Sequence, residues 1–453
     1  SLAAEFPTQT DLPLILSFRR QSDGGGCAIG ERARLASLFA ASRGAWAYVE
    51  IEEDVKKSEL RFKGAEDKRR IDLLADLASR DIVVIRSSYD TSGVPADIYG
   101  RIMRLSKEGA IPKLVAHPTN LMDVITLFRV EKELATVEKK IIVATGPWAK
   151  AAQILYRRCG SLIGYATPTQ ESGGVFLDAQ SLSELYRADQ IDRRTHIYGM
   201  IGNPLIHEAT CRIYNPGFVA IRYNAVYVPF LVDQVRTFFK LAELLQIRGF
   251  SVTGSHTRSV LPYLGKISRE VKQIGSCNTV VRIKSMWKGI NTAYYGFLAP
   301  ISDAMTQEEI KHALVIGSGN AARAVVWALH NHGVKITILN RSSEPAHLLA
   351  SQTMSTYDTL ESAHAYSESV DLVVQASSVP ATEMPIPSFR FSGKEIAYEL
   401  AYEDSETAFL IAASSGGARV LHGKEMFLAQ TKLQFEAFTG YHYPHWIAVA
   451  LND

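Results

Sequence analysis

In the first part of the chain, short apolar runs alternate with amphipathic stretches. Between Leu12 and about Tyr186 five such runs occur, namely LPLILSF, WAYVEIE, DIVVIRSS, IPKLVA and KIIVAT. Short runs rich in β-branched and apolar residues are typical of buried strands, and the stretches between them have the apolar spacing of helices. The alternation predicts repeated βα units, and therefore a parallel sheet or barrel. We interpret the polar stretch from Ala188 to Arg194 as a linker before the strand HIYGMIG, which opens at His196.

After Thr306 the pattern predicts a βαβ unit of nucleotide-binding type. The strand HALVIG is followed by the turn GSGNAAR, a helix, and a second strand KITILNRS. Glycines in such a turn let backbone N–H groups at the start of the helix face a pyrophosphate, and an arginine after the second strand suits the 2′-phosphate of NADP. The candidate NADP contacts are Gly317, Gly319, Asn320, Ala321, Asn340 and Arg341. The alternative is a βα turn kept for packing after ligand binding was lost.

Composition narrows the class of protein. A chain of 453 residues is long enough for two or three domains, and 47% hydrophobic with 21% charged residues is ordinary for a globular protein. The net charge of +2 creates no field that attracts nucleic acid, so direct binding of nucleic acid is not expected. The four cysteines form no C-x-x-C pair, so neither a metal site nor a disulfide framework is predicted. No apolar run approaches the roughly 18 residues of a membrane span, and we expect a protein of the nucleus, the cytoplasm or both.

Several segments together resemble shikimate dehydrogenase, over about Ile197 to Thr439. They are YGMIGNPLIHEATCRIYN, GFSVTGSHT, IGSCNTVVR, GINTAYYG, GSGNAARA and HGKEMFLAQTKLQFEAFTG. The resemblance implies a pair of α/β domains. One is a substrate domain formed by residues 195–298 plus about 420–453, and the other is a Rossmann-like domain of NADP-binding type at residues 299–419.

The upstream strands resemble those of a type I 3-dehydroquinate dehydratase. The most specific match, GAIPKLVAHPTNLMDVITLF, places Lys113 where that family keeps its Schiff-base lysine. The resemblance implies an α/β fold that opens with an incomplete (β/α) barrel over residues 1–190. The match starts at about the second helix of the barrel, so we expect the N-terminal part of the barrel to be missing.

Positions that carry acid–base chemistry in both families hold other residues here. The lysine and aspartate that manage the proton of the substrate hydroxyl in shikimate dehydrogenases are matched by Thr257 and Ala293, which do not titrate near neutral pH. The proton-shuttling histidine of the dehydratase is matched by Tyr89, whose ordinary pKa of roughly 10 suits a shuttle poorly. Two serines that hold the substrate carboxylate are matched by Glu208 and Thr210, and Glu208 would repel that anion. We therefore expect a chain that is not an enzyme.

Other ligand-binding positions of the two families are retained. In the dehydratase-like part the candidates are Arg19, Glu52, Lys113 and Gln180, while the family's substrate-binding arginine falls near Gln153. In the dehydrogenase-like part the candidates are Asn278, Thr279, Asn291, Thr292, Tyr402 and Gln430. These side chains could hold a cyclic polyol, or they could be hydrogen-bonding struts of neighbouring loops.

The order of the two parts, with altered catalytic positions, resembles the fungal quinate-pathway repressor family, which is itself similar to the C-terminal domains of the pentafunctional AROM polypeptide. That resemblance implies a transcription repressor that binds an activator protein and senses quinate-pathway or shikimate-pathway metabolites. It implies no required cofactor and leaves room for residual NADP binding. The alternatives are a bifunctional dehydroquinate dehydratase/shikimate dehydrogenase with altered catalytic residues, and a scaffolding paralogue of the AROM assembly.

Overall fold

The chain folds as two compact units. A computed structural model describes residues 10–63, 70–107, 109–169, 175–205, 210–307, 309–402 and 406–449. The first unit holds residues 1–196 and 226–246, and the second holds residues 197–225 and 247–453. Residues 226–246 contain all of helix α8 (Val235–Leu245) and most of strand β9 (Ala225–Leu231).

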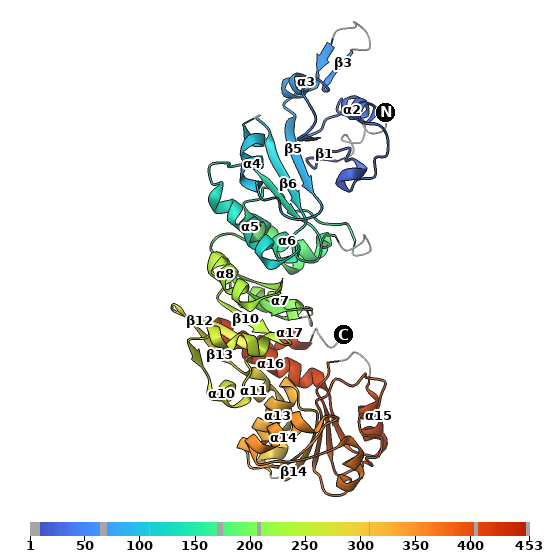
Figure 1. Cartoon of the computed structure of the whole chain (residues 1–453), viewed down its shortest axis with the longest axis vertical. Coiled ribbons are helices and arrows are strands. Elements are labelled where there is room, and N and C mark those ends of the chain that lie inside the picture. Colours follow the sequence, from blue (N-terminus) through green and yellow to red (C-terminus); the bar gives the residue numbers. More distant parts are fainter. Residues whose placement is uncertain are drawn as a thin grey trace. The chain divides into compact units, whose positions relative to one another are not determined.

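The first unit is built on a parallel sheet with strand order β1-β2-β5-β6-β7. Its strands are β1 (Ile15–Leu16), β2 (Tyr48–Glu52), β5 (Val83–Asp90), β6 (Ile111–Ala116) and β7 (Ile141–Ala144), and a separate antiparallel hairpin joins β3 (Arg61–Lys63) to β4 (Arg70–Asp72). The helices are α2 (Glu31–Ala41), α3 (Leu73–Ser79), α4 (Ile98–Ser106), α5 (Leu121–Glu133) and α6 (Lys150–Ile154) (Figure 1). Strands paired in chain order with helical crossovers form a curled sheet. This sheet of five strands is a half-barrel, since a complete barrel of this kind has eight strands.

Successive side chains of each strand point to opposite faces of this sheet. Val49 and Ile51 pack in one core cluster with leucines of α2 and α3. Ile111 and Val115 of β6 belong to a second cluster, on the inner face, which also contains Tyr165. Because side chains alternate along a strand, Lys113 lies on the inner face together with Ile111 and Val115.

The stretch that we interpreted as a linker is packed structure. It contains a 3₁₀ turn at Ala188–Gln190, and the side chains of Ala188 and Ile191 are buried. The carboxylate of Asp192 accepts hydrogen bonds from the backbone N–H groups of Arg194 and Thr195. These contacts hold the stretch in place up to the start of β8 (His196–Gly202).

The second unit opens with a mixed sheet in which strands follow the order β11-β13-β12-β10-β8. Its further strands are β10 (Gly249–Val252), β11 (Lys266–Ile267), β12 (Thr279–Ile283) and β13 (Met286–Ile290). β10 runs parallel to β8 and antiparallel to β12. The helices of this part are α7 (Cys211–Ala220), α9 (His256–Ser259), α10 (Arg269–Ile274), α11 (Thr292–Leu298), α12 (Ser302–Thr306), α16 (Gly423–Thr439) and α17 (His445–Val449).

The rest of the second unit is a parallel sheet with strand order β16-β15-β14-β17-β18-β19. The chain runs through β14 (His312–Ile316), α13 (Asn320–Asn331), β15 (Lys335–Leu339), α14 (Ser343–Thr353), β16 (Thr356–Asp358), β17 (Leu372–Gln375), β18 (Ile396–Glu399), α15 (Ala408–Ser415) and β19 (Arg419–Leu421). In chain order this is 3-2-1-4-5-6, the arrangement of dinucleotide-binding folds, with its switch point between β14 and β17. Helices α13 and α14 cover one face and α15 the other (Figure 1), so the predicted Rossmann-like fold is confirmed.

Within the described ranges, no helix is long and apolar enough to cross a membrane.

Candidate functional site

In the first unit, buried charged side chains gather around Lys113. Its Nζ lies 2.9 and 3.0 Å from the two carboxylate oxygens of Glu50 on β2, and both side chains are almost fully buried. The Tyr89 hydroxyl on β5 donates a hydrogen bond to Glu50. The ring of Tyr165 lies 4.7 Å from Nζ of Lys113. The site is therefore one buried ion pair enclosed by two aromatic rings.

The members of this cluster hold one another in defined charge states. Burial by itself lowers the pKa of Lys113, but the charge and hydrogen bond of Glu50, together with Tyr165 and Tyr89, outweigh burial and raise that pKa above its ordinary value. Burial by itself raises the pKa of Glu50, but the charge of Lys113 and the Tyr89 hydroxyl bring it below its ordinary value. Burial and the charge of Glu50 raise the pKa of Tyr89. At neutral pH the site holds an ammonium, a carboxylate and a neutral phenol.

Glu52, predicted as a ligand-binding residue, is the partner of Arg34 instead. Its two carboxylate oxygens each lie 2.9 Å from a guanidinium nitrogen of Arg34 on α2. The sheet register aligns Glu52 with Ser87 and Ser87 with Lys113, so register alone would pair Glu52 with the lysine. The long side chain of Lys113 reaches diagonally to Glu50 instead. The sequence signal for Glu50 is its spacing of two from Glu52, which puts both carboxylates on the inner face.

Arg19 and Gln180 differ in their relation to this cluster. The guanidinium carbon of Arg19 lies 5.5 Å from the centre of the Tyr89 ring, so Arg19 is at the edge of the site. Gln180 is exposed and donates a hydrogen bond to Glu184. The structure therefore brings Arg19, but not Gln180, to the cluster around Lys113.

In the second unit, the predicted position Asn278 lies beside Thr257 and Thr292. Oδ1 of Asn278 accepts a hydrogen bond of 2.9 Å from the backbone N–H of Thr292. The backbone N–H of Cys277 donates to the carbonyl oxygen of Thr257 at 2.8 Å. Ala293, next to Thr292 in the first turn of α11, packs against apolar residues. The residues matched to dehydrogenase chemistry therefore meet in space, and Thr257 and Ala293 contribute a hydroxyl and a methyl group there.

Several other predicted positions contact neighbouring parts of the protein through hydrogen bonds or packing. The side chain of Gln153 bonds three backbone groups, among them the carbonyl oxygen of Ala144 at 3.0 Å. Asn291 caps α11 and donates to the carbonyl oxygen of Ser276 at 3.0 Å. The rings of Tyr402 and Phe427 lie 4.9 Å apart. Gln430, on α16, packs against Gly296 of α11, where an added Cβ would lie 2.9 Å from the Gln430 Cβ.

The predicted repulsion of a substrate carboxylate is not tested by the structure. Glu208 lies outside the described residues. Thr210 is buried, and its hydroxyl lies 3.5 Å from the sulfur of Met200. Thr210 therefore faces the interior of the second unit.

The turn between β14 and α13 has the backbone that close approach to a ligand requires. Gly317 has φ +108°, and an added Cβ would lie 2.9 Å from the carbonyl oxygen of Ala376. At Gly319 an added Cβ would meet no atom within 4 Å, so the space beside the helix start is open. Ala321 and Arg341 are exposed, and they follow the carboxyl ends of the neighbouring strands β14 and β15. These features fit a dinucleotide phosphate, with Arg341 placed to meet a 2′-phosphate.

Asn320 and Asn340 bond to protein groups in this structure. Nδ2 of Asn320 donates to the Thr257 hydroxyl at 2.8 Å, and its Oδ1 accepts from Nε of Arg258 at 3.2 Å. Asn340 donates to the carbonyl oxygen of Ser342 at 2.8 Å. The first residue of α13 is therefore tied to Thr257, the position matched to the catalytic lysine of the dehydrogenases.

Replacing Gly317 by alanine is expected to destabilise the Rossmann-like part by about 1 to 3 kcal/mol, because a side chain is strained at this φ. The added Cβ would also press on the Ala376 carbonyl. Urea titration followed by hydrogen exchange of peptides from β14 and α13 would measure the change. Gly319→Ala is the matched control, with φ −71° and open space; an equal loss in both variants would contradict the argument.

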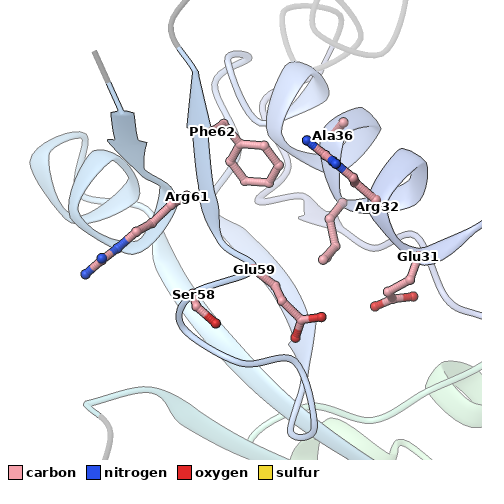
Figure 2. A pocket seen from close by; sticks show the side chains of 8 residues that line it. Glu31, Arg32, Ala36, Ser58, Glu59, Arg61 and Phe62 are labelled. Atoms are coloured by element: carbon pink, nitrogen blue, oxygen red, sulfur yellow. The ribbon is translucent and has the colours of Figure 1, made fainter. Parts of the chain in front are cut away.

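A cavity of about 690 Å³ in the first unit lies away from the Lys113 cluster. It is lined by Glu31, Arg32, Leu35, Ala36, Ser58, Glu59, Arg61 and Phe62. Figure 2 shows Phe62 and the Arg32 guanidinium at one end and the carboxylates of Glu31 and Glu59 at the other. Leu35 packs in the core cluster of Val49 and Ile51, on the face of the sheet opposite to Lys113. The cavity therefore lies on that face, and none of its lining residues belongs to the Lys113 cluster.

Known families match the chain in three segments. The type I 3-dehydroquinase family matches residues 1–193, the shikimate dehydrogenase substrate binding domain residues 200–280, and the shikimate / quinate 5-dehydrogenase family residues 302–386. A shikimate dehydrogenase (NADP(+)) of Caldanaerobacter subterraneus subsp. tengcongensis is 31% identical over 264 residues, which cover 55% of this chain and 94% of that protein. The chain belongs to the shikimate dehydrogenase family. Its first part is a type I dehydroquinase domain.

One relative matches nearly the whole of this shikimate dehydrogenase family chain, and a solved structure matches more than half of it. The bifunctional 3-dehydroquinate dehydratase/shikimate dehydrogenase of Arabidopsis thaliana is 26% identical over 458 residues, covering 95% of this chain and 74% of that protein. The solved shikimate dehydrogenase of Aquifex aeolicus is 28% identical to this chain, with a TM-score of 0.54. The match covers 58% of this chain and 100% of the Aquifex chain. The predicted order of a dehydroquinase domain and dehydrogenase domains is confirmed.

The prediction that this shikimate dehydrogenase family chain is not an enzyme is wrong. It rested on Tyr89, Thr257 and Ala293, whereas both families that match the chain, and the bifunctional relative that spans it, are enzymes. Three replaced side chains were given more weight than the family allows, because other groups at a site can take over proton transfer. In the dehydroquinase domain Glu50, which was not among the predicted residues, accepts hydrogen bonds from both Lys113 and Tyr89.

Proposed function

We propose that this chain is a bifunctional protein of the dehydroquinate dehydratase/shikimate dehydrogenase type, in which Glu50 is the base of the dehydratase site and the dehydrogenase site lacks its acid–base pair. The observation that carries the proposal is the Lys113 ammonium, held at 2.9 Å from Glu50 on the inner face of the half-barrel. A buried lysine that has lost its proton to solvent attacks a carbonyl carbon as the neutral amine and forms an imine with loss of water. The ligand would be a ring polyol with a ketone, such as dehydroquinate.

In this site Glu50 and Tyr89 have distinct parts. Glu50 is ionised and accepts a proton from the carbon next to the imine, and it then returns that proton to the hydroxyl that leaves as water. Tyr89, whose pKa is raised, keeps its proton and serves as a hydrogen-bond donor. Glu50 thus stands where a base is needed, although the histidine position holds a tyrosine.

The dehydrogenase half offers binding groups for a second polyol, at Asn278 and Thr292. The turn at Gly317 and Gly319 together with Arg341 would hold NADP, which accepts hydride when it is bound. Thr257 and Ala293 supply no general acid or base, and each lost group costs roughly 10²- to 10⁴-fold in rate. We expect shikimate to bind here and its oxidation to be slow by these factors.

Dehydration of dehydroquinate is expected to accelerate about tenfold for each pH unit between 7 and 10, without a plateau. The reason is that only the neutral amine of Lys113 attacks a carbonyl, and the pKa of Lys113 is raised above its ordinary value by Glu50. Product absorbance would follow the rate, and borohydride reduction with mass spectrometry would locate the trapped imine on Lys113.

Lys113→Met is the control for this assay, because it keeps the length of the side chain and removes the amine. A wild-type rate at pH 10 that does not exceed the rate of this variant would overturn the proposed dehydration. A rate that is flat with pH would overturn the requirement that Lys113 first loses its proton to solvent.

A second candidate function is regulation, in which the chain binds a transcription activator and a quinate-pathway or shikimate-pathway metabolite controls that contact. It is supported by the bond between Asn320 and Thr257, which ties the nucleotide turn to the polyol site, since a ligand acts as a signal only if it binds two conformations differently. This role would need the chain in the nucleus or cytoplasm. Copurification with an activator that quinate abolishes would support it, and copurification that quinate leaves unchanged would oppose it.

A further inference from the structure

The strongest polar network outside the sites described above is centred on Gln434. This side chain on α16 is 2% exposed. Its Oε1 accepts hydrogen bonds from the hydroxyls of Tyr214 at 2.7 Å and Ser251 at 3.0 Å. Its Nε2 donates to the carbonyl oxygen of Asn278 at 3.2 Å and to the hydroxyl of Thr279 at 2.8 Å. All four hydrogen-bonding positions of the amide are therefore used.

The orientation of the Gln434 amide follows from one backbone group. The carbonyl oxygen of Asn278 can only accept, so the nitrogen of Gln434 must face it. That nitrogen then also donates to Thr279, whose own proton is left for Oδ1 of Asn278 at 2.9 Å or for the Thr292 hydroxyl at 3.1 Å. Both routes end on Oδ1 of Asn278, because the Thr292 hydroxyl lies 3.2 Å from that atom.

The orientation of the Asn278 amide is determined in the same way. The backbone N–H of Thr292 can only donate, so the atom facing it is Oδ1. The hydroxyl of Thr292 also lies within 3.2 Å of Oδ1. Oδ1 of Asn278 therefore lies within hydrogen-bond distance of the Thr292 backbone N–H and of the two threonine hydroxyls. Nδ2 of the half-buried Asn278 donates no hydrogen bond to any described residue, so its two N–H groups are what Asn278 offers to a ligand.

We propose that Gln434 is a positioning residue that acts through Thr279 to hold Asn278 with its amide N–H groups toward the ligand, so that the ligand group met by Asn278 is a hydrogen-bond acceptor oxygen. The proposal rests on the proposed function, because it takes the ligand to be a shikimate-type ring polyol. Gln434 touches no ligand itself, since it is buried behind β12.

Shikimate binding measured by calorimetry on the full chain tests the relay. Gln434→Met and Thr279→Val are each expected to weaken binding at least tenfold, and the double variant no further, because the two residues act in one chain of bonds. Thr279→Ser keeps the hydroxyl and is expected to bind within twofold of wild type. Circular dichroism of each variant confirms that the chain is folded.

Asn278→Asp tests the class of ligand group. It keeps the shape of the side chain and replaces both donors by a carboxylate oxygen, so binding of shikimate is expected to fall at least tenfold. Unchanged affinity in this variant would overturn the assignment of Asn278 as a donor. Equal losses in Thr279→Val and Thr279→Ser would overturn the relay, because only the hydroxyl distinguishes them.

A crystal structure of Gln434→Met separates this proposal from the proposed function. A changed rotamer of Asn278 in that variant is the expected result, and an unmoved amide would overturn the positioning role whether or not shikimate binds. If the wild-type chain binds no shikimate, the proposed function fails for the dehydrogenase half, and the variant structure still decides the part played by Gln434.

Discussion

Glu50→Gln is expected to destabilise the first unit by about 3 to 5 kcal/mol near pH 7, which is the usual cost of removing one partner of a buried ion pair. Lys113 would remain buried but would lose the Glu50 carboxylate, an oxygen of which lies 2.9 Å from its Nζ. Burial disfavours a charged amine that has no partner, so the pKa of Lys113 would drop below its ordinary value. Urea titration read by hydrogen exchange of peptides from β6 would measure the loss.

The pH dependence of this variant has a definite sign. With the folded pKa of Lys113 below the unfolded value of about 10.4, the unfolded chain binds more protons, so stability rises with pH. The loss is full below the folded pKa and disappears as pH approaches the unfolded one. The same shift should move borohydride trapping of dehydroquinate on Lys113 to lower pH than in wild type.

The double variant Glu50→Leu with Lys113→Met is the control, because an apolar pair replaces the ion pair. It is expected to recover most of the lost stability, since such exchanges are often neutral or stabilising. A double variant as unstable as Glu50→Gln would show that the loss came from packing and not from the unpaired charge.

Arg34→Met is expected to cost a similar amount, about 3 to 5 kcal/mol, with the opposite pH dependence. Arg34 is 1% exposed and contacts Glu52, Glu31 and the carbonyl oxygen of Phe18. Burial already raises the pKa of Glu52, and removing the guanidinium would raise that pKa further. Urea titration with hydrogen exchange of peptides from β2 would measure the change.

A carboxyl group with a raised folded pKa contributes stability below its unfolded pKa and loses it as pH rises through the folded value. Arg34→Met should therefore be most stable near pH 4 to 5 relative to wild type, and least stable above pH 7. Arg43→Met is the matched control, because Arg43 is half-exposed and its bond to Asp76 is 3.3 Å long; such pairs contribute about 0 to 1 kcal/mol. Equal losses in the two arginine variants would contradict the importance of burial.

The spacing of residues predicted much of the fold and part of the site. Apolar runs separated by helical stretches predicted a parallel sheet or barrel, and the GSGNAAR turn between two strands predicted the Rossmann-like sheet, because both are local patterns with a short period. The incomplete barrel was implied only by the resemblance to the dehydroquinases. Lys113 was predicted from the resemblance of its segment to the type I dehydroquinases, and it is the centre of the buried cluster. The functional interpretation of Tyr89, Thr257 and Ala293 failed, because a substitution at one position does not report what neighbouring strands supply.

The sequence by itself determined which face of a strand each side chain occupies, since alternation along a strand has a period of two. It could not determine which partner that side chain finds. Glu50 and Glu52 share a face of the sheet. Only the folded half-barrel shows that Glu52 pairs with Arg34 on α2 and that Glu50 pairs with Lys113 on β6. In the same way Gln434 lies more than 150 positions from Asn278. Partners across strands and helices depend on three-dimensional reach and on competition between neighbours, and only the tertiary structure decides these.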